Sequence, residues 1–253
     1  MAEPVEVVRS SALDAVPHGF LGRRGGVSTG VAAGLNVGLG SLDDDAAVMR
    51  NRALAAASVL PGAELVTPYQ VHSPDAVIVR SAWTLADRPR ADAVVTDQPG
   101  LLLGIVTADC APVLLADFEA GVIAAAHAGW RGAHDGVIAS TVAAMEQLGA
   151  EPARIRAAVG PCIAQASYEV DDAFRDRFGP EAEEFFEPGK PGHQHFDLEG
   201  YAASRLAAAG VEIVDRLGLD TYGDAARFFS YRRAVHLAEE TYGRQLSLIG
   251  LPG

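Results

Sequence analysis

The sequence feature that most constrains the fold is a pair of apolar runs, residues 112–116 and 122–126, separated by a short link. The link, residues 117–121, contains a glycine and has the length of a hairpin loop, so the two runs are predicted to pair as antiparallel strands. Cys110 lies just before the first run, and His127 directly follows the second. Antiparallel pairing would bring this thiol and this imidazole to the same end of the hairpin. Their juxtaposition indicates either a metal site or a nucleophile–base pair.

The composition favours a globular protein that folds without external help. Of the 253 residues, 49% are hydrophobic, which is enough to bury a full core. The chain has 20 basic and 33 acidic residues, a net charge of −13 that argues against a nucleic-acid binder. Its two cysteines, Cys110 and Cys162, do not form a disulfide framework. Without a signal-peptide pattern or an apolar run of transmembrane length, we expect a cytoplasmic protein that does not enter a membrane.

Periodicity and turn residues predict strands and helices in alternation along the chain. Helices are predicted over residues 41–57, 136–148, 171–178 and 198–209. Strands are predicted over residues 5–8, 66–71, 76–80, 91–96, 101–107, 155–159 and 245–251, while 211–217 fits either element. Because strands occur both in hairpins and between helices, the sheets should be mixed. We interpret residues 1–253 as one domain.

Two further segments carry candidate chemistry. Gln70-Val71-His72 ends a predicted strand with an imidazole, which by itself is either a structural histidine or a ligand. The glycine-rich segment 18–38 is predicted to be a close-packed loop, which is either purely structural or has backbone amides that face a ligand. It is not a phosphate-binding P-loop, because no Gly-Lys-Ser/Thr follows the glycines.

Motifs from residue 18 to near residue 250 match one known family in the family's own order. The most specific are Thr107-Ala-Asp109-Cys110-x-Pro and His127-Ala-Gly-Trp-Arg131-Gly. The others include His18-Gly-Phe, Arg23-x-Gly-Gly-Val-Ser, Leu35-Asn36-Val-Gly, Gln70-Val-His72, Ala91-Asp92-Ala and Phe229-Ser-Tyr-Arg232-Arg. On these motifs the chain resembles the YfiH-type laccase-domain family, also called the peptidoglycan editing factor or multicopper polyphenol oxidase family. It departs from the family pattern at Asp220-Thr221, where members often have Cys-Thr, and in a longer segment 233–244.

The resemblance implies a fold, a metal and an activity. The fold is α/β (mixed α+β), a layered sandwich of mixed β-sheets flanked by helices. The metal is one zinc ion bound by His72, Cys110 and His127, and copper is the alternative occupant. The activity is that of a purine nucleoside phosphorylase on adenosine, inosine and methylthioadenosine, together with adenosine deamination. The implied partners are therefore a purine nucleoside and phosphate, bound by a monomer or small homo-oligomer.

Four other residues are weaker candidates, each with an ordinary structural alternative. Arg131 follows Trp130 and could clamp phosphate or a developing oxyanion. Asp109 lies beside the thiol and could orient a ligand or move a proton. Arg23 and Asn36, in the glycine-rich segment, could contact phosphate or ribose.

Three alternatives to a zinc enzyme differ in how they use the same residues. A laccase-like polyphenol oxidase with four coppers would need many more imidazoles than the seven histidines present. A Cys–His hydrolase that edits peptidoglycan precursors would use Cys110 as nucleophile and His127 as base, leaving His72 without a role. A structural zinc-binding module fits less well, because three protein ligands leave an open coordination position.

Overall fold

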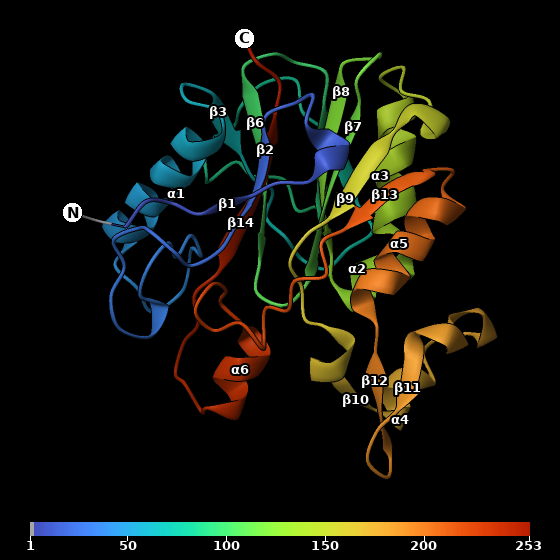
Figure 1. The fold of residues 1–253 in the computed structure, drawn as a ribbon. Coiled ribbons are helices and arrows are strands. Elements are labelled where there is room, and N and C mark those ends of the chain that lie inside the picture. The colour runs from blue at the N-terminus through green and yellow to red at the C-terminus, as the bar shows by residue number, and fades with distance from the viewer. Residues whose placement is uncertain (1–2) are drawn as a thin grey trace.

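The computed structural model describes residues 3–253, in which two large mixed sheets are stacked between helices (Figure 1). One sheet has five strands in the order β1 (Val7–Val8), β2 (His18–Leu21), β14 (Gln245–Gly250), β6 (Leu101–Thr107) and β3 (Glu64–Val66). The other has six, in the order β13 (Ile213–Arg216), β9 (Arg156–Val159), β7 (Ala111–Asp117), β8 (Val122–Ala128), β5 (Ala93–Thr96) and β4 (Ala76–Ile78). The predicted class, a layered sandwich of mixed sheets flanked by helices, is confirmed.

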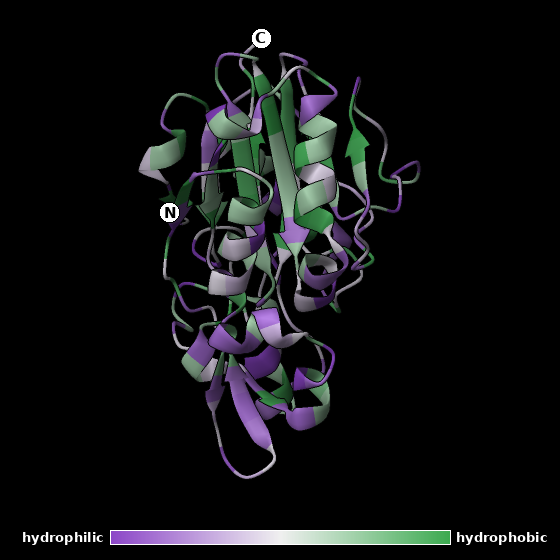
Figure 2. Cartoon of the chain, turned by 90° about the vertical axis from the view of Figure 1, so that its right-hand side faces the viewer, coloured by the Kyte–Doolittle hydropathy of each residue, from purple (hydrophilic) through white to green (hydrophobic). Residues whose placement is uncertain are grey.

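The alternation of side chains along the central hairpin creates the layers. On β7, Val113 and Leu115 pack toward the helices, while Leu114 and Ala116 pack toward the five-stranded sheet. Every residue of β7 and β8 is buried, because both faces of the six-stranded sheet are covered. Figure 2 shows hydrophobic residues concentrated in these inner strands.

The three longest helices cover the two outer faces of the stacked sheets. The helices are α1 (Asp45–Val59), α2 (Trp130–Asp135), α3 (Val137–Glu146), α4 (Asp172–Arg175), α5 (Leu198–Ala208) and α6 (Tyr231–His236). Helix α1 packs on the five-stranded sheet, whereas α3 and α5 pack on the six-stranded one (Figure 1). Helix α1 begins where Asp44 accepts a hydrogen bond from the Ala46 N–H, close to the predicted start.

Several predicted elements differ from the structure. Residues 18–21, predicted to be loop, form the buried strand β2, whose two neighbours supply its hydrogen bonds. The predicted strand 66–71 is wrong, because β3 already ends at Val66 and His72 lies in a loop. The predicted helix 171–178 is only the short α4, and 211–217 contains strand β13. A third sheet, in the order β10 (Glu169–Asp171), β12 (His193–Phe196) and β11 (Phe186–Pro188), was not predicted.

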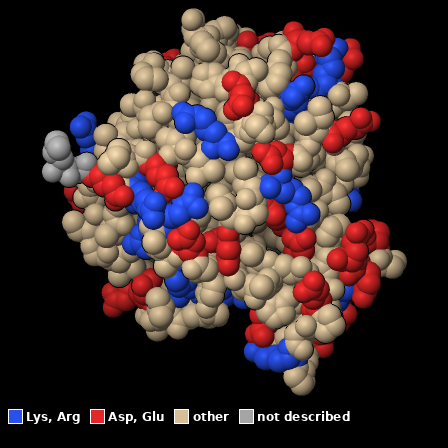
Figure 3. All heavy atoms as spheres, in the orientation of Figure 1, with Lys and Arg blue, Asp and Glu red and all other residues tan. Residues whose placement is uncertain are grey.

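Charge is distributed without a dominant basic surface on the face in Figure 3, where Lys and Arg side chains are interspersed with Asp and Glu. This distribution agrees with the net charge of −13. Within residues 3–253, each helix is too short or too polar to cross a membrane.

Candidate metal centre and its cavity

The β7–β8 hairpin brings Cys110 and His127 together, as the sequence predicts. In its register Pro112 pairs with His127 and Ala111 with Ala128, so Cys110, one residue before β7, lies beside the end of β8. This placement depends only on the length of the loop and on antiparallel pairing. The first two candidate ligands are therefore positioned by the most buried part of the fold.

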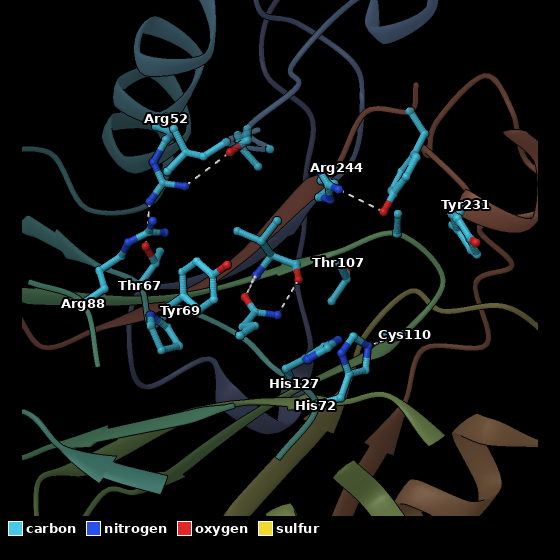
Figure 4. Close-up of a pocket in the computed structure, with 18 residues that line it drawn as sticks. Arg52, Thr67, Tyr69, His72, Arg88, Thr107, Cys110, His127, Tyr231 and Arg244 are labelled. Carbon is cyan, nitrogen blue, oxygen red and sulfur yellow. Dashed lines mark hydrogen bonds between the residues drawn. The ribbon is translucent and has the colours of Figure 1, made fainter. Parts of the chain in front are cut away.

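His72 joins them from the loop between β3 and β4. Its backbone has φ 60°, a left-handed conformation that is unusual for a residue other than glycine. The His72 Nε2 atom lies 3.9 Å from the Cys110 Sγ atom, and the rings of His72 and His127 are 4.7 Å apart at their centroids. One donor atom from each of the three residues lies within 4.8 Å of the other two, so the group could bind a metal ion (Figure 4).

Asp92, directly before β5, fixes two of the three ligands. One carboxylate oxygen lies 2.7 Å from His127 Nδ1, which leaves Nε2 of that ring free to bind a metal. The other oxygen accepts hydrogen bonds from the Val71 and Ser73 N–H groups, on either side of His72. Asp92 is fully buried, and the sequence motif Ala91-Asp92-Ala was recognised without this role being assigned.

The electrostatics of the group favour charged ligands. Removal from water opposes ionisation of the Cys110 thiol, but His127 and His72 outweigh it and lower the pKa of Cys110 to about 6. Burial likewise opposes protonation of His127, yet the Cys110 thiolate and Asp92 raise its pKa to about 9. The pKa of Asp92 is lowered to about 2, because bonds from His127, Ser73 and Val71 outweigh its burial. Cys110 is therefore readily available as a thiolate, the form that binds metals.

Gly129 provides the space in which the ligands meet. A Cβ atom at this position would lie 2.9 Å from Cys110 Sγ and 2.9 Å from His72 Cδ2. The backbone of Gly129, with φ −65° and ψ 159°, is open to any residue, so the restriction is steric contact with the ligands. The requirement for glycine in the His127-Ala-Gly-Trp motif follows from the site rather than from backbone strain.

The geometry and chemistry of the three donors fit zinc. A tetrahedral zinc ion with sulfur and nitrogen ligands holds its donor atoms roughly 3.5 Å apart, so the donors, now 3.9 Å apart for Cys110 and His72 and within 4.8 Å overall, would draw closer around the ion. Two imidazoles and a thiolate suit zinc and can also bind copper. Three protein ligands leave a fourth position for a reacting group.

A cavity of about 540 Å³ lies beside the three ligands (Figure 4). Its wall combines the metal ligands with aromatic and basic side chains. The lining residues are Val37, Gly38, Leu39, Arg52, Thr67, Pro68, Tyr69, Gln70, His72, Arg88, Val106, Thr107, Ala108, Cys110, His127, Tyr231, Tyr242 and Arg244. The open side of the ligand group therefore faces a space large enough for a small organic substrate.

The remaining candidates from the sequence lie outside this lining. The Asp109 carboxylate accepts hydrogen bonds from Thr221 Oγ1 and from the Arg232 N–H, which ties Thr221 and the first turn of α6 to the residue before Cys110. Arg131 stacks on Trp130, 5.2 Å from the ring centroid. Arg52, Thr107 and Arg244 also line the cavity, although the sequence predicts no site role for them, because nothing local marks them as neighbours.

Arg23 and Asn36 lie in the glycine-rich segment, and their side chains form hydrogen bonds with other parts of the chain. The guanidinium of Arg23 donates to the carbonyls of Ala33 and Ala225. Asn36 is fully buried, and its side-chain oxygen accepts hydrogen bonds from the N–H groups of Gly38 and Arg244. Asn36 thus positions two residues of the cavity wall, whereas Arg23 holds two segments that lie outside the lining.

The fold and the site define a layered α/β protein with a candidate His₂Cys metal centre at one end of a central hairpin. Residues 17–252 match the family model described as multi-copper polyphenol oxidoreductase laccase. The chain belongs to this family, the YfiH-type laccase-domain family of the sequence motifs.

Relatives and solved structures agree with this membership over nearly the whole chain. A protein from Deinococcus radiodurans named purine nucleoside phosphorylase is 43% identical over 241 residues, 94% of this chain and 90% of its own. The Streptomyces coelicolor purine nucleoside phosphorylase SCO2081 is 40% identical, over 92% of this chain and 94% of its own. The Neisseria meningitidis protein NMB0706 superposes with a TM-score of 0.87 at 35% identity, covering 99% of this chain and 100% of its own. YlmD from Geobacillus stearothermophilus has a TM-score of 0.85 at 32% identity, covering 96% and 94%.

Proposed function

We propose that this protein is a zinc-dependent purine nucleoside phosphorylase that acts on adenosine, inosine and methylthioadenosine and also deaminates adenosine. The observation that carries the proposal is the convergence of His72, Cys110 and His127 at the wall of a cavity of about 540 Å³. The names of the relatives support the phosphorylase activity. Adenosine deamination and the individual substrates are inferred from the family resemblance.

In phosphorolysis the bond between the sugar's anomeric carbon and the purine nitrogen breaks, and a phosphate oxygen bonds to that carbon. The base leaves with the bonding electrons and takes up a proton. Bound zinc would supply a Lewis acid that stabilises developing negative charge. His72, Cys110 and His127 would hold the ion, and Asp92 keeps the His127 ring in its binding orientation. Tyr69, Tyr231 and Tyr242 offer aromatic surface for the purine in the cavity wall.

In deamination, water replaces the amino group at C6 of adenosine and ammonia leaves. The same three ligands would serve both reactions, because they form the one metal-ligating group found within residues 3–253. We assign no substrate contact to Arg23, Asn36, Asp109 or Arg131, since other residues line the cavity. Asp109 is proposed to act as a positioning residue for the first turn of α6.

The test is incubation of zinc-loaded protein with inosine in the presence and absence of phosphate. We expect hypoxanthine and ribose 1-phosphate to appear only with phosphate, measured by chromatography and phosphorus NMR. Cys110→Ala should lose both the bound zinc and the activity, while Cys162→Ala, which removes the other thiol, should keep both. An absence of phosphate-dependent hypoxanthine release from the zinc-loaded wild type would refute the phosphorylase assignment.

A Cys–His hydrolase is a second candidate, favoured by the mutual stabilisation of a Cys110 thiolate and a His127 imidazolium. Such an enzyme would keep its activity after metal is removed with a chelator. Chelation therefore separates the two functions: a phosphorylase that uses zinc should lose turnover and regain it when zinc is restored.

A further inference from the structure

The cavity wall away from the metal ligands is strongly basic although the protein is acidic. Arg52, Arg88 and Arg244 line it, and the part of the chain that the structure describes places no Asp or Glu in the lining. Over the whole sequence, acidic residues outnumber basic ones by 33 to 20. Three guanidinium groups without a carboxylate in the wall of one cavity favour an anionic ligand.

Arg52 is a buried cation with neutral partners. It projects from α1, is 4% exposed, and donates to the Val37 carbonyl at 3.3 Å and to Thr67 Oγ1 at 2.8 Å. Burial and, to a lesser degree, the charge of Arg88 lower the pKa of Arg52 to about 10. Figure 4 shows the two guanidinium groups next to each other. A bound anion would offset the repulsion between these two guanidinium groups.

Arg244 and Thr107 line the same cavity, and each has a side-chain polar atom without a hydrogen-bond partner. Arg244 Nη2 donates to the Tyr242 hydroxyl at 2.9 Å, and the guanidinium stacks on that ring. Its Nη1 and the hydroxyl of Thr107, a residue 2% exposed, are the two buried side-chain N or O atoms within residues 3–253 that have no partner. Because buried polar groups are nearly always paired, both atoms point to a ligand.

The loop at residues 36–38 contacts both Arg52 and Arg244 and so fixes their relative position. The Val37 carbonyl accepts from Arg52, while the Val37 N–H donates to the Arg244 carbonyl. At Gly38 a Cβ atom would lie 2.8 Å from Arg244 Nη1, so glycine lets the guanidinium lie against the backbone. Strand pairing of Thr107 with Gln245 places the threonine beside Arg244.

We propose that Arg244, Thr107 and Arg52 form the subsite that binds the phosphate co-substrate. The guanidinium fork of Arg244 and the threonine hydroxyl would donate to phosphate oxygens, and the charge of Arg52 would hold the anion in the cavity. This assignment rests on the proposed phosphorylase function for the identity of the anion. A phosphate group carried by a nucleotide has the same chemistry, so the two sources must be separated by experiment.

The experiment combines kinetics with direct binding. With zinc-loaded protein at saturating inosine, Arg244→Met and Arg52→Met should raise the KM for phosphate roughly 10- to 100-fold. Arg50→Met, which changes an exposed arginine on the same helix as Arg52, is the matched control and should leave that KM unchanged. Isothermal titration of inorganic phosphate into the same proteins measures the subsite without turnover.

Thr107→Val separates a binding role from a structural one. The threonine hydroxyl has no protein partner, so its removal should not lower the melting temperature. We expect a rise of roughly fivefold in the phosphate KM with the melting temperature maintained. This variant keeps the proposal testable even if Arg52→Met fails to fold.

The outcomes distinguish the subsite from the function. If the wild type carries out phosphorolysis and the Arg244 and Thr107 variants keep its phosphate KM and affinity, the subsite is wrong and the function stands. If the wild type shows no phosphorolysis but binds phosphate in an Arg244-dependent way, the subsite stands and the function falls. Titration with inosine 5′-monophosphate tests whether the phosphate group comes from a nucleotide instead. Arg244-dependent binding of the nucleotide but not of free phosphate would overturn the co-substrate assignment.

Discussion

At the scale of single residues, the candidate metal centre depends on a carboxylate that touches no substrate space. Asp92 binds the ring of His127 with one oxygen and the backbone on both sides of His72 with the other. Two ligands from segments 55 residues apart therefore share one buried acceptor. The ligand geometry is set before any metal arrives, which reduces the cost of binding.

Asp92→Asn is expected to weaken zinc binding roughly 10- to 100-fold, because the amide nitrogen replaces one of the two acceptor oxygens. Competition with a chromophoric chelator measures the change. Asp135→Asn is the control: Asp135 also contacts a histidine, His134, but on the surface. An unchanged zinc affinity in Asp92→Asn would show that the carboxylate does not position the ligands.

Gly129→Ala tests the steric argument at the same site. The added Cβ would meet Cys110 Sγ and His72 Cδ2 at 2.9 Å, so one ligand must move. We expect at least a tenfold loss of zinc affinity, with the far-UV circular dichroism of the wild type. At Gly132 a Cβ would meet the carbonyl oxygens of Ser73 at 3.3 Å and His127 at 3.4 Å, which need to move by a few tenths of an ångström, so Gly132→Ala should lose much less zinc affinity than Gly129→Ala.

At the scale of elements, the β7–β8 hairpin is held at the end opposite the ligands by Asp117. Its carboxylate accepts hydrogen bonds from the N–H groups of Glu119 and Ala120 in the turn, from the Glu151 N–H and from Arg154. Burial alone would raise the pKa of Asp117, but Arg154 and the three N–H groups outweigh it and lower that pKa. The hairpin turn is thereby tied to the segment that leads into β9.

Asp117→Asn is expected to lower the free energy of unfolding at pH 7 by about 2–3 kcal/mol, since a buried charged acceptor is lost. Because the folded pKa lies below the unfolded value of about 3.9, this stabilisation is complete above that pH and disappears as pH falls through the folded pKa. Urea unfolding at pH 7 and at about pH 3 should therefore show a difference between wild type and variant that shrinks in acid. Glu119→Gln, at an exposed carboxylate 3.8 Å from Arg154, should change stability by less than about 0.5 kcal/mol. A difference that persists undiminished in acid would contradict the assigned role of the charge.

At the scale of the whole molecule, the three candidate ligands come from segments attached to different sheets. His72 follows β3 of the five-stranded sheet, whereas Cys110 precedes β7 and His127 lies in β8 of the six-stranded one. The core between the sheets contains side chains of both, such as Phe20 and Leu114. We propose that residues 1–253 unfold as one domain and that bound metal adds a link across it.

Removal of zinc should accordingly lower the melting temperature without changing the secondary structure. At a free zinc concentration about 1,000 times the dissociation constant, binding stabilises the folded state by about 4 kcal/mol. For a chain of this size that corresponds to roughly 8–16 °C. Scanning calorimetry with and without a chelator should show a single transition that shifts. The Cys110→Ala protein is the control, and a chelator should not shift its transition.

The sequence by itself determined the features that depend on local pairing. The loop length between residues 112–116 and 122–126 was sufficient to place Cys110 beside His127, and the hydrophobic pattern predicted β6 and the central hairpin. Strand β2 was not predicted. It contains a glycine, and its hydrogen bonds are made to β1 and β14, so no local pattern marks it as a strand. From spacing alone, His72 could be a structural histidine or a metal ligand, and the family resemblance predicted the ligand.

Only the tertiary structure decided which distant residues share the cavity. Thr107 lies beside Arg244 because β6 pairs with β14, whose first residue Gln245 is far from Thr107 in the sequence. Arg52 lines the same cavity from helix α1, which packs on that sheet. Asp92 gained its role in the same way, from the pairing of β5 with β8 beside the loop of His72. A buried cation or carboxylate has no local signature, because its partners are set by how the layers stack.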